Sequence, residues 1–304
     1  MFKQFIQTAL VLSVTVSPVY TIAGDDEARD QNQSDEKKIA NFTFRKEIDI
    51  QKDRVPILGQ VSSEGENIYM AMEKDFQKSL YVKKRNEETG NFKEAQKLKG
   101  PVNNSDYNVI TASVTEDENT MVFVGSEDGT QQGNDLYIAS RDGNGEKFAD
   151  VRKLEEINTK GQSDMHPWIS ADGLRLYFTK QQGDQIHFYQ ASRTNPTEEF
   201  ISLNKMDLEV PHVSNNVSCL FTDRETTAYI VSGNKIYRSD REDRNDSFGK
   251  PEKIAETNQS SYINGITMTA DKRELYIFNS EGFKDIHLKK YINEDKREVP
   301  AVSR

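Results

Sequence analysis

Three aspartates, Asp53, Asp106 and Asp164, each come shortly before a strand-like stretch. Paired carboxylates are what glycoside hydrolases use, one as acid and the other as nucleophile or base. Aspartate is also a common loop residue, and these three lie nine, nine and six residues before the hydroxyl residue of the next turn. The three aspartates therefore do not occupy equivalent positions before their turns. We keep hydrolysis as the alternative function and assign no catalytic residue.

Metal binding has weak support in the sequence. His166 and His212 could approach Asp164 at a metal ion, but spacing along the chain does not show whether they meet. The acidic, glycine-rich loop 126–135 carries oxygen donors but lacks the ligand spacing and final glutamate of a calcium-binding EF-hand. We therefore predict no metal site and no cofactor.

A repeated unit must position these side chains. Residues 166–170, 174–180 and 187–193 alternate apolar and polar residues and are separated by an Ala-Asp-Gly turn and a glycine-containing loop, which predicts three strands. The turn recurs five times, each time with a hydroxyl residue six positions before an apolar one. The hydroxyl residues are Ser62, Thr115, Ser170, Thr222 and Thr269.

Two further signals complete each unit. Four units place an arginine four residues after the aromatic residue of the third strand: Arg85, Arg141, Arg193 and Arg241. A fourth element then carries a phenylalanine with an apolar residue six positions later: Phe92/Leu98, Phe148/Leu154, Phe200/Met206 and Phe248/Ile254. Units of about fifty residues with four strands are typical of β-propeller blades.

The fifth unit lacks the fourth element after Tyr291, whereas the segment Asn41–Ile48 carries such a strand before the first unit begins. An N-terminal strand that completes the last blade closes a ring and joins the two termini. We therefore predict an all-β fold, a β-propeller of five four-stranded blades closed by an N-terminal strand. Six blades and an open β-solenoid are the alternatives.

The segments ISADGLRLYFTK and DQIHFYQASR, with ASVTEDENTMVFVGSEDGTQQGNDLYIASR, resemble the WD40-like repeats of TolB-type bacterial β-propellers. The resemblance runs from Asp53 to about Tyr291. The Asp-Gly turn of those repeats is replaced by Glu64-Gly65, Arg224-Glu225 and Asp271-Lys272, and TolB-type proteins often have six blades. The resemblance implies an exported propeller that binds protein or small ligands, sometimes within a cell-envelope assembly.

In a propeller, the segments that lead into the innermost strands converge on one face of the central channel, where ligands usually bind. Aromatic residues there could stack on a ligand while polar ones hydrogen-bond to it. The alternative is that the polar residues solvate the channel and Trp168 packs between blades. The candidate ligand-binding residues are Arg54, Tyr107, Asn108, Asp164, His166, Trp168, His212, Tyr262 and Asn264.

The N-terminus has the pattern of a cleavable secretory signal: Lys3, a mostly apolar run over 5–19 and small residues ending at Ala23. The run is interrupted by polar residues, which disfavours a membrane anchor. We predict a signal peptide over 1–23, a disordered leader over 24–40, a propeller over 41–295 and a tail over 296–304. The expected location is periplasmic or secreted, with no integral membrane segment after cleavage.

The formal charge of -10, with acidic and basic residues interspersed, disfavours nucleic acid as a partner. The single cysteine, Cys219, allows no intrachain disulfide and lies in a strand-like stretch, where we expect a buried thiol. Together these features favour an exported, non-enzymatic bacterial propeller that binds a protein or carbohydrate ligand at its channel face.

Overall fold

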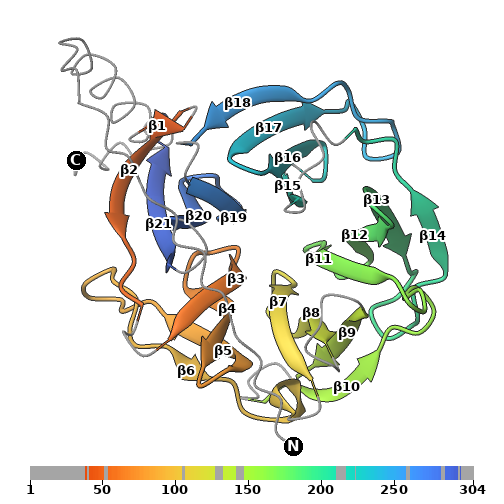
Figure 1. The fold of residues 1–304 in the computed structure, drawn as a ribbon, viewed down its shortest axis with the longest axis horizontal. Helices are drawn as coiled ribbons and strands as arrows, with labels where there is room; N and C mark the ends of the chain where they lie inside the picture. The colour runs from red at the N-terminus through yellow and green to blue at the C-terminus, as the bar shows by residue number, and fades with distance from the viewer. Residues whose placement is uncertain are drawn as a thin grey trace, which may run out of the picture.

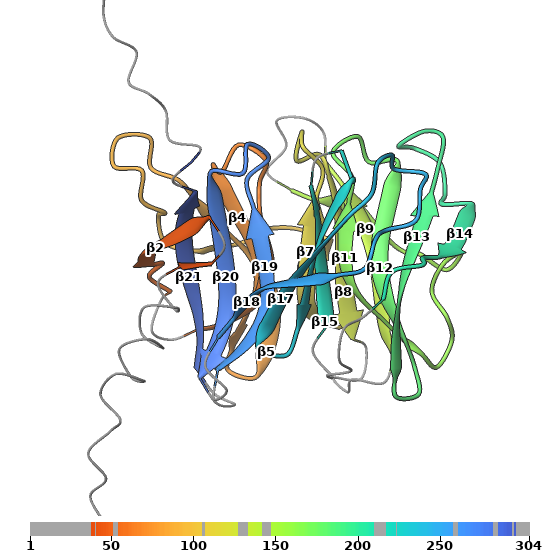
Figure 2. The same cartoon turned by 90° about the horizontal axis from the view of Figure 1, so that it is seen from above.

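The computed structural model describes residues 38–39, 41–50, 54–104, 107–126, 133–141, 147–209, 217–222, 224–257, 261–281, 285–293 and 295. These residues form five antiparallel sheets arranged in a ring, with one short 3₁₀ turn, η1 (Pro101–Asn103), between the first two blades (Figure 1). Seen edge on, the strands stand across the thickness of the ring (Figure 2). The chain is a five-bladed β-propeller.

Each blade runs from an innermost strand at the channel to an outermost strand at the rim. Blade 1 contains β3 (Val55–Val61), β4 (Asn67–Lys74), β5 (Gln77–Lys84) and β6 (Gln96–Lys97), and blade 2 contains β7 (Asn108–Val114), β8 (Thr120–Ser126), β9 (Asn134–Ser140) and β10 (Ala149–Lys153). Blade 3 contains β11 (Ser163–Ile169), β12 (Arg175–Gln182), β13 (Gln185–Ser192) and β14 (Ser202–Lys205), and blade 4 contains β15 (Val217–Thr222), β16 (Thr227–Ser232), β17 (Lys235–Asp240) and β18 (Glu252–Glu256). Blade 5 contains β19 (Ser261–Met268), β20 (Glu274–Glu281), β21 (Asp285–Asn293), β2 (Phe42–Glu47) and β1 (Lys38–Ile39).

The ring is closed as the sequence predicts. Strand β2 pairs antiparallel with β21, with Phe42 opposite Asn293 and Thr43 opposite Ile292. Past its end, the Ile48 N–H donates to Leu288 O at 2.8 Å. Strand β1 then pairs with β2 on its outer side, although it lies within the segment 24–40 predicted to be unstructured. Strand pairing needs only backbone N–H and C=O groups, so a composition poor in apolar residues does not prevent it.

A belt of hydrogen bonds holds the innermost strands side by side. The backbone N–H of Val61 donates to Thr267 Oγ1 at 3.0 Å, linking blade 1 to blade 5. Equivalent bonds run from Val114 N to Gln60 Oε1 (2.8 Å) and from Ile169 N to Ser113 Oγ (2.9 Å). Each acceptor lies two residues before the turn hydroxyl of its own blade, so the innermost strands run parallel and in step. At the other two seams this position holds Trp168 and Leu220, neither of which offers a side-chain oxygen.

A second set of contacts, from the repeated arginines, joins the blades further out. The guanidinium carbons of Arg85, Arg141, Arg193 and Arg241 lie 4.8, 4.8, 4.6 and 4.2 Å from the ring centroids of Phe92, Phe148, Phe200 and Phe248. Three of the arginines also donate to a tyrosine hydroxyl of the preceding blade: Arg85 to Tyr276 (3.0 Å), Arg141 to Tyr69 (3.4 Å) and Arg241 to Tyr177 (3.3 Å). Those hydroxyls donate in turn to Glu274, Glu118 and Glu225. The arginine and phenylalanine signals of the sequence are therefore seam contacts.

Two of these glutamates explain why some turns depart from the Asp-Gly pattern. Glu118 (φ 56°) and Glu225 (φ 73°) occupy the left-handed turn position that Gly65 and Gly173 hold in blades 1 and 3. A side chain costs free energy in this conformation. At both positions, however, the carboxylate reaches a tyrosine of the preceding blade, and that hydrogen bond offsets the backbone strain.

Arg193 lacks such a partner because the preceding blade has Val122 where the others have tyrosine. Its Nε donates to Gly173 O at 2.7 Å, but its buried Nη2 has no acceptor among the described residues. Burial, with Arg152 nearby, lowers the pKa of Arg193 to about 10. Glu156 is near enough to oppose this shift, but within the described residues it forms no ion pair with Arg193 like those that Arg85 and Arg141 make.

We therefore expect Arg193→Met to change the free energy of unfolding far less than Arg85→Met. The two arginines are matched, because Arg85 Nε also donates to a glycine carbonyl, Gly65 O, at 2.7 Å. Arg85→Met also removes the bonds to Glu274 and Tyr276 and should cost about 1–3 kcal/mol more. Urea unfolding of the two variants measures the difference, and equal losses would contradict it.

Candidate functional site

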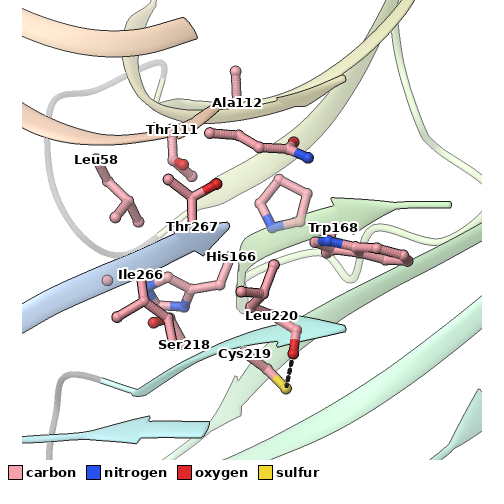
Figure 3. Close-up of a pocket in the computed structure, with 14 residues that line it drawn as sticks. Leu58, Thr111, Ala112, His166, Trp168, Ser218, Cys219, Leu220, Ile266 and Thr267 are labelled. Atoms are coloured by element: carbon pink, nitrogen blue, oxygen red, sulfur yellow. Dashed lines mark hydrogen bonds between the residues drawn. The ribbon is translucent and has the colours of Figure 1, made fainter. Parts of the chain in front are cut away.

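The channel holds a small cavity at mid-height, bounded by all five innermost strands (Figure 3). Its volume is about 40 Å³, which is room for about three water molecules. The cavity is narrow partly because Leu58 fills the space beside Gly265, where a Cβ atom would lie 2.2 Å from Leu58 Cδ1. None of the 14 residues that line it is Asp, Glu, Lys or Arg.

His166 is the polar centre of this cavity. It has a positive φ of 52° and lies in a β-bulge between Met165 and Trp168, an arrangement that turns a side chain out of the regular strand pattern. Its Nδ1 lies 3.1 Å from Thr179 Oγ1, whose own proton goes to Met165 O at 3.2 Å. In the tautomer with the proton on Nδ1, the ring donates to Thr179 and Nε2 is left as an acceptor. Burial lowers the pKa of His166 to about 4, so the imidazole is neutral at pH 7.

Trp168 serves mainly as a packing residue between blades 3 and 4. Its ring centroid lies 5.7 Å from that of Tyr177 and 5.5 Å from that of Phe221. The side chain is half-buried and also borders the cavity. The alternative interpretation of the sequence, in which Trp168 packs between blades, therefore accounts for most of its contacts.

Asp164 is fully buried and serves the fold. It forms an ion pair with Lys180 at 2.9 Å and accepts the backbone N–H of Thr159 at 2.8 Å. Lys180 Nζ also donates to Ile157 O at 2.6 Å, so the pair secures the connection that leads into blade 3. Burial raises the pKa of Asp164 above its ordinary value in spite of Lys180. The carboxylate is not accessible to a channel ligand.

Three other candidates also make contacts within the protein. Arg54 Nη1 donates to Ala95 O at 3.3 Å, and the guanidinium lies 4.9 Å from the Tyr81 ring centroid. The Tyr107 hydroxyl donates to Pro101 O at 2.7 Å, and its ring stacks on Tyr137 at 5.1 Å. Asn108 Oδ1 accepts the backbone N–H of Lys78 in blade 1 at 3.2 Å.

The remaining candidates do not complete a site. Asn264 Oδ1 accepts a hydrogen bond from Ser280 Oγ at 3.1 Å, and Tyr262 is exposed. His212, Asp53 and Asp106 lie outside the described residues. Of the eight predicted ligand-binding residues that the structure describes, His166 and Trp168 alone line the channel cavity.

A surface feature that combines the predicted residue Tyr262 with two residues that the prediction missed lies where the inner strands begin, on what we call the inlet face. Phe76 is 94 % exposed, Tyr262 44 % and Val55 42 %. Val55 pairs with Glu73, next to the β4–β5 turn that carries Phe76. Tyr262 is the second residue of β19, which runs in step with β3, so all three side chains lie on the same face of the ring. We call them the inlet patch.

The turn that carries Phe76 has a detectable sequence signal. Asp75 (φ 52°) and Phe76 (φ 64°) form a two-residue hairpin in which both backbones are left-handed. Asn-Gly or Asp-Gly would relieve this strain, and an aromatic residue at the second position is unusual. An aromatic residue at the tip of a two-residue hairpin lies beyond the ends of both strands and is therefore expected to be exposed.

Within the described part of the chain, no helix is long and apolar enough to span a membrane, and no three His, Cys, Asp or Glu side chains group as metal ligands. No protein-family model and no curated protein matches the sequence. Solved structures with a similar fold include a nidogen/laminin complex (12 % identity, TM-score 0.46, 74 % of this chain and 72 % of that chain). TolB from Acinetobacter baumannii (12 %, 0.43, 78 % and 54 %) and a glucose dehydrogenase (10 %, 0.44, 81 % and 84 %) are others. This chain spans about half the length of that TolB chain, and these likenesses concern the fold alone.

Proposed function

We propose that the protein is an exported, non-enzymatic propeller that binds a protein partner through the inlet patch. The observation that carries the proposal is Phe76, an aromatic side chain held almost fully in solvent by a strained turn. Exposed aromatic residues beside other apolar ones are typical anchors of protein interfaces, and strained turns cluster at functional sites.

A binding role is favoured over hydrolysis by the chemistry of the channel. Its cavity has an uncharged lining, and a glycoside hydrolase needs two carboxyl groups facing its substrate. Asp164 forms a buried ion pair with Lys180. Among the described residues, neither the cavity lining nor Asp164 therefore supplies a carboxylate for an acid–base reaction, and Asp53 and Asp106 lie outside them.

A protein partner is favoured over a carbohydrate by the composition of the inlet patch. Val55 and Phe76 have no hydrogen-bonding groups in their side chains, whereas sugar binding depends on polar groups around an aromatic ring. Export is proposed from the signal-like N-terminus, which places the partner in the periplasm or outside the cell. Membership of a cell-envelope assembly fits the same location and the repeat resemblance.

The experiment is capture of partners from the extracytoplasmic fraction of the source cells, with a photo-crosslinking residue at position 76. The double variant Phe76→Ser, Tyr262→Ser should weaken binding of the captured protein at least about 30-fold, because aromatic anchors contribute most of the binding free energy. Glu88→Ser, at an exposed residue of the loop between β5 and β6 and outside both proposed binding surfaces, is the control and should bind normally. Trp168→Ala tests the channel: loss of binding in that variant alone would move the site from the inlet patch to the channel.

A further inference from the structure

Strand β14 is the outermost strand of blade 3, and among the described residues it pairs on one side only, with β13. The N–H of Met206, directly after β14, donates to Phe188 O at 2.9 Å. Hydrogen-bonded and non-hydrogen-bonded pairs alternate along an antiparallel ladder. Ser202 and Asn204 therefore bond inward to β13, while Leu203 and Lys205 direct their backbone N–H and C=O groups outward.

This edge exposes two large apolar side chains. Ile201 is 75 % exposed and Leu203 is 41 % exposed. The outer strands of blades 1, 2 and 4 instead carry charged residues, the usual protection of an edge against pairing with another chain. These residues are Lys97 in β6, Asp150, Arg152 and Lys153 in β10, and Glu252, Lys253 and Glu256 in β18. In β14 only Lys205 is charged.

Blade 5 shows that an outer edge of this ring can pair with an additional strand. There β1 adds to the outermost strand β2 in antiparallel register, with Lys38 opposite Thr43 and Ile39 opposite Phe42. A blade of this propeller therefore accommodates a fifth strand on the outside. The edge of β14 offers the same backbone groups without a partner strand.

A groove of about 300 Å³ continues from this edge towards blade 4, between β13–β14 and the loop 241–248. Its lining contains three cationic and two acidic side chains: Lys205, Arg241, Arg244, Asp207 and Asp246. Arg241 is bound to backbone oxygens of Glu225 and Asp246, but Lys205 and Arg244 form no ion pair within the described part of the chain. The groove lining therefore carries one more cationic than acidic side chain, while Glu242 and Asp243 of the same loop do not line it. In a chain of formal charge -10, such a lining favours an acidic occupant.

We propose that the outer edge of β14 is a docking site for an extended segment of a partner protein, which adds to blade 3 as a fifth strand. The backbone groups of Leu203 and Lys205 pair with the segment, an apolar residue of the segment packs on Ile201 and Leu203, and an acidic residue meets Lys205 and Arg244. Strand addition of this kind takes affinity from backbone bonds and specificity from side chains. The site is separate from the inlet patch and does not depend on it.

The probe is a random library of ten-residue peptides, selected on the full-length protein and then synthesised for fluorescence anisotropy. We expect enriched peptides that combine apolar and acidic residues. Binding should protect the Leu203 and Lys205 amides from hydrogen exchange. Leu203→Pro should weaken binding at least about tenfold, because it removes an outward donor and leaves the bonds to β13 in place. Backbone N-methylation of the peptide should have a similar effect.

Controls separate this site from others. Lys205→Glu with Arg244→Glu keeps every backbone donor, so it tests the site even if Leu203→Pro perturbs folding, and it should weaken acidic peptides at least about tenfold. Phe76→Ser, in the inlet patch, should not change binding. The proposal is overturned if no peptide family is enriched, if N-methylated peptides bind as well as their parents, or if Phe76→Ser abolishes binding.

Discussion

Phe42→Ala is expected to lower the free energy of unfolding by about 3–5 kcal/mol, the cost of removing a buried phenylalanine from a packed core. Phe42 is only 6 % exposed and begins β2, the strand that closes the ring. It belongs to a hydrophobic cluster that includes Ile236 of blade 4 and Leu275 of blade 5. The substitution therefore weakens both the closure and the seam between the last two blades. Urea unfolding followed by circular dichroism measures the loss.

Two further variants serve as a control for this substitution and as a test of ring closure. Thr43→Ala, at the next position of β2, should change stability by less than about 1 kcal/mol because the side chain is only half-buried. A chain without residues 1–47 should lose its sharp transition and associate, since the edge of β21 is then unpaired. A monomeric truncated chain that unfolds like the full-length protein would show that β2 does not close the ring.

Glu274→Ala should lower the free energy of unfolding by about 3–5 kcal/mol, because it leaves two partly buried cations without their counter-ion. The Glu274 carboxylate lies 2.5 Å from both Arg85 Nη2 and Lys290 Nζ, and it also accepts the Tyr276 hydroxyl. This cluster joins blade 5 to blade 1. Glu64→Ala, at an exposed glutamate, is the matched control and should have no measurable effect.

The same cluster predicts a dependence on pH. Burial raises the pKa of Glu274, but the bonds from Arg85, Lys290 and Tyr276 outweigh it and hold the pKa below the ordinary value of 4.5. The folded state then binds the proton less readily than the unfolded state. The stabilisation is complete above pH 4.5 and is lost as the pH falls through the folded-state pKa. The stability difference between wild type and Glu274→Ala should therefore shrink below pH 4.5, and a difference that stays constant would contradict this assignment.

Much of the fold could be predicted because its determinants are local and repeated. In blades 1, 2, 3 and 5 the turn hydroxyl accepts the backbone N–H that begins the next strand, as Ser170 Oγ does from Arg175 N at 2.9 Å. A local bond of this kind requires the same residue type at the same position in every blade. The closing strand could be found because the fifth unit lacks one element and Asn41–Ile48 supplies it.

The candidate site could not be predicted in the same way, because side-chain direction depends on strand register. Four of the five innermost strands contain a one-residue bulge, and each bulge reverses the faces of the residues before it. The bulges lie between Pro56 and Leu58, Val109 and Thr111, Met165 and Trp168, and Ile263 and Gly265. Asp164 and His166 are two residues apart and would share a face on a regular strand. In the protein, one is buried with Lys180 and the other faces the channel.

The sequence by itself determined the blade repeat, the five-bladed ring and its closure, since these depend on alternation and turn chemistry within about fifty residues. Only the tertiary structure decided which polar side chains bond to other parts of the protein and which face the channel. Arg54, Tyr107, Asn108 and Asp164 look like channel residues along the chain, but their partners come from strands and loops that folding brings beside them. The same applies to Phe76 and Leu203, whose exposure follows from their positions at a turn and at an outer edge.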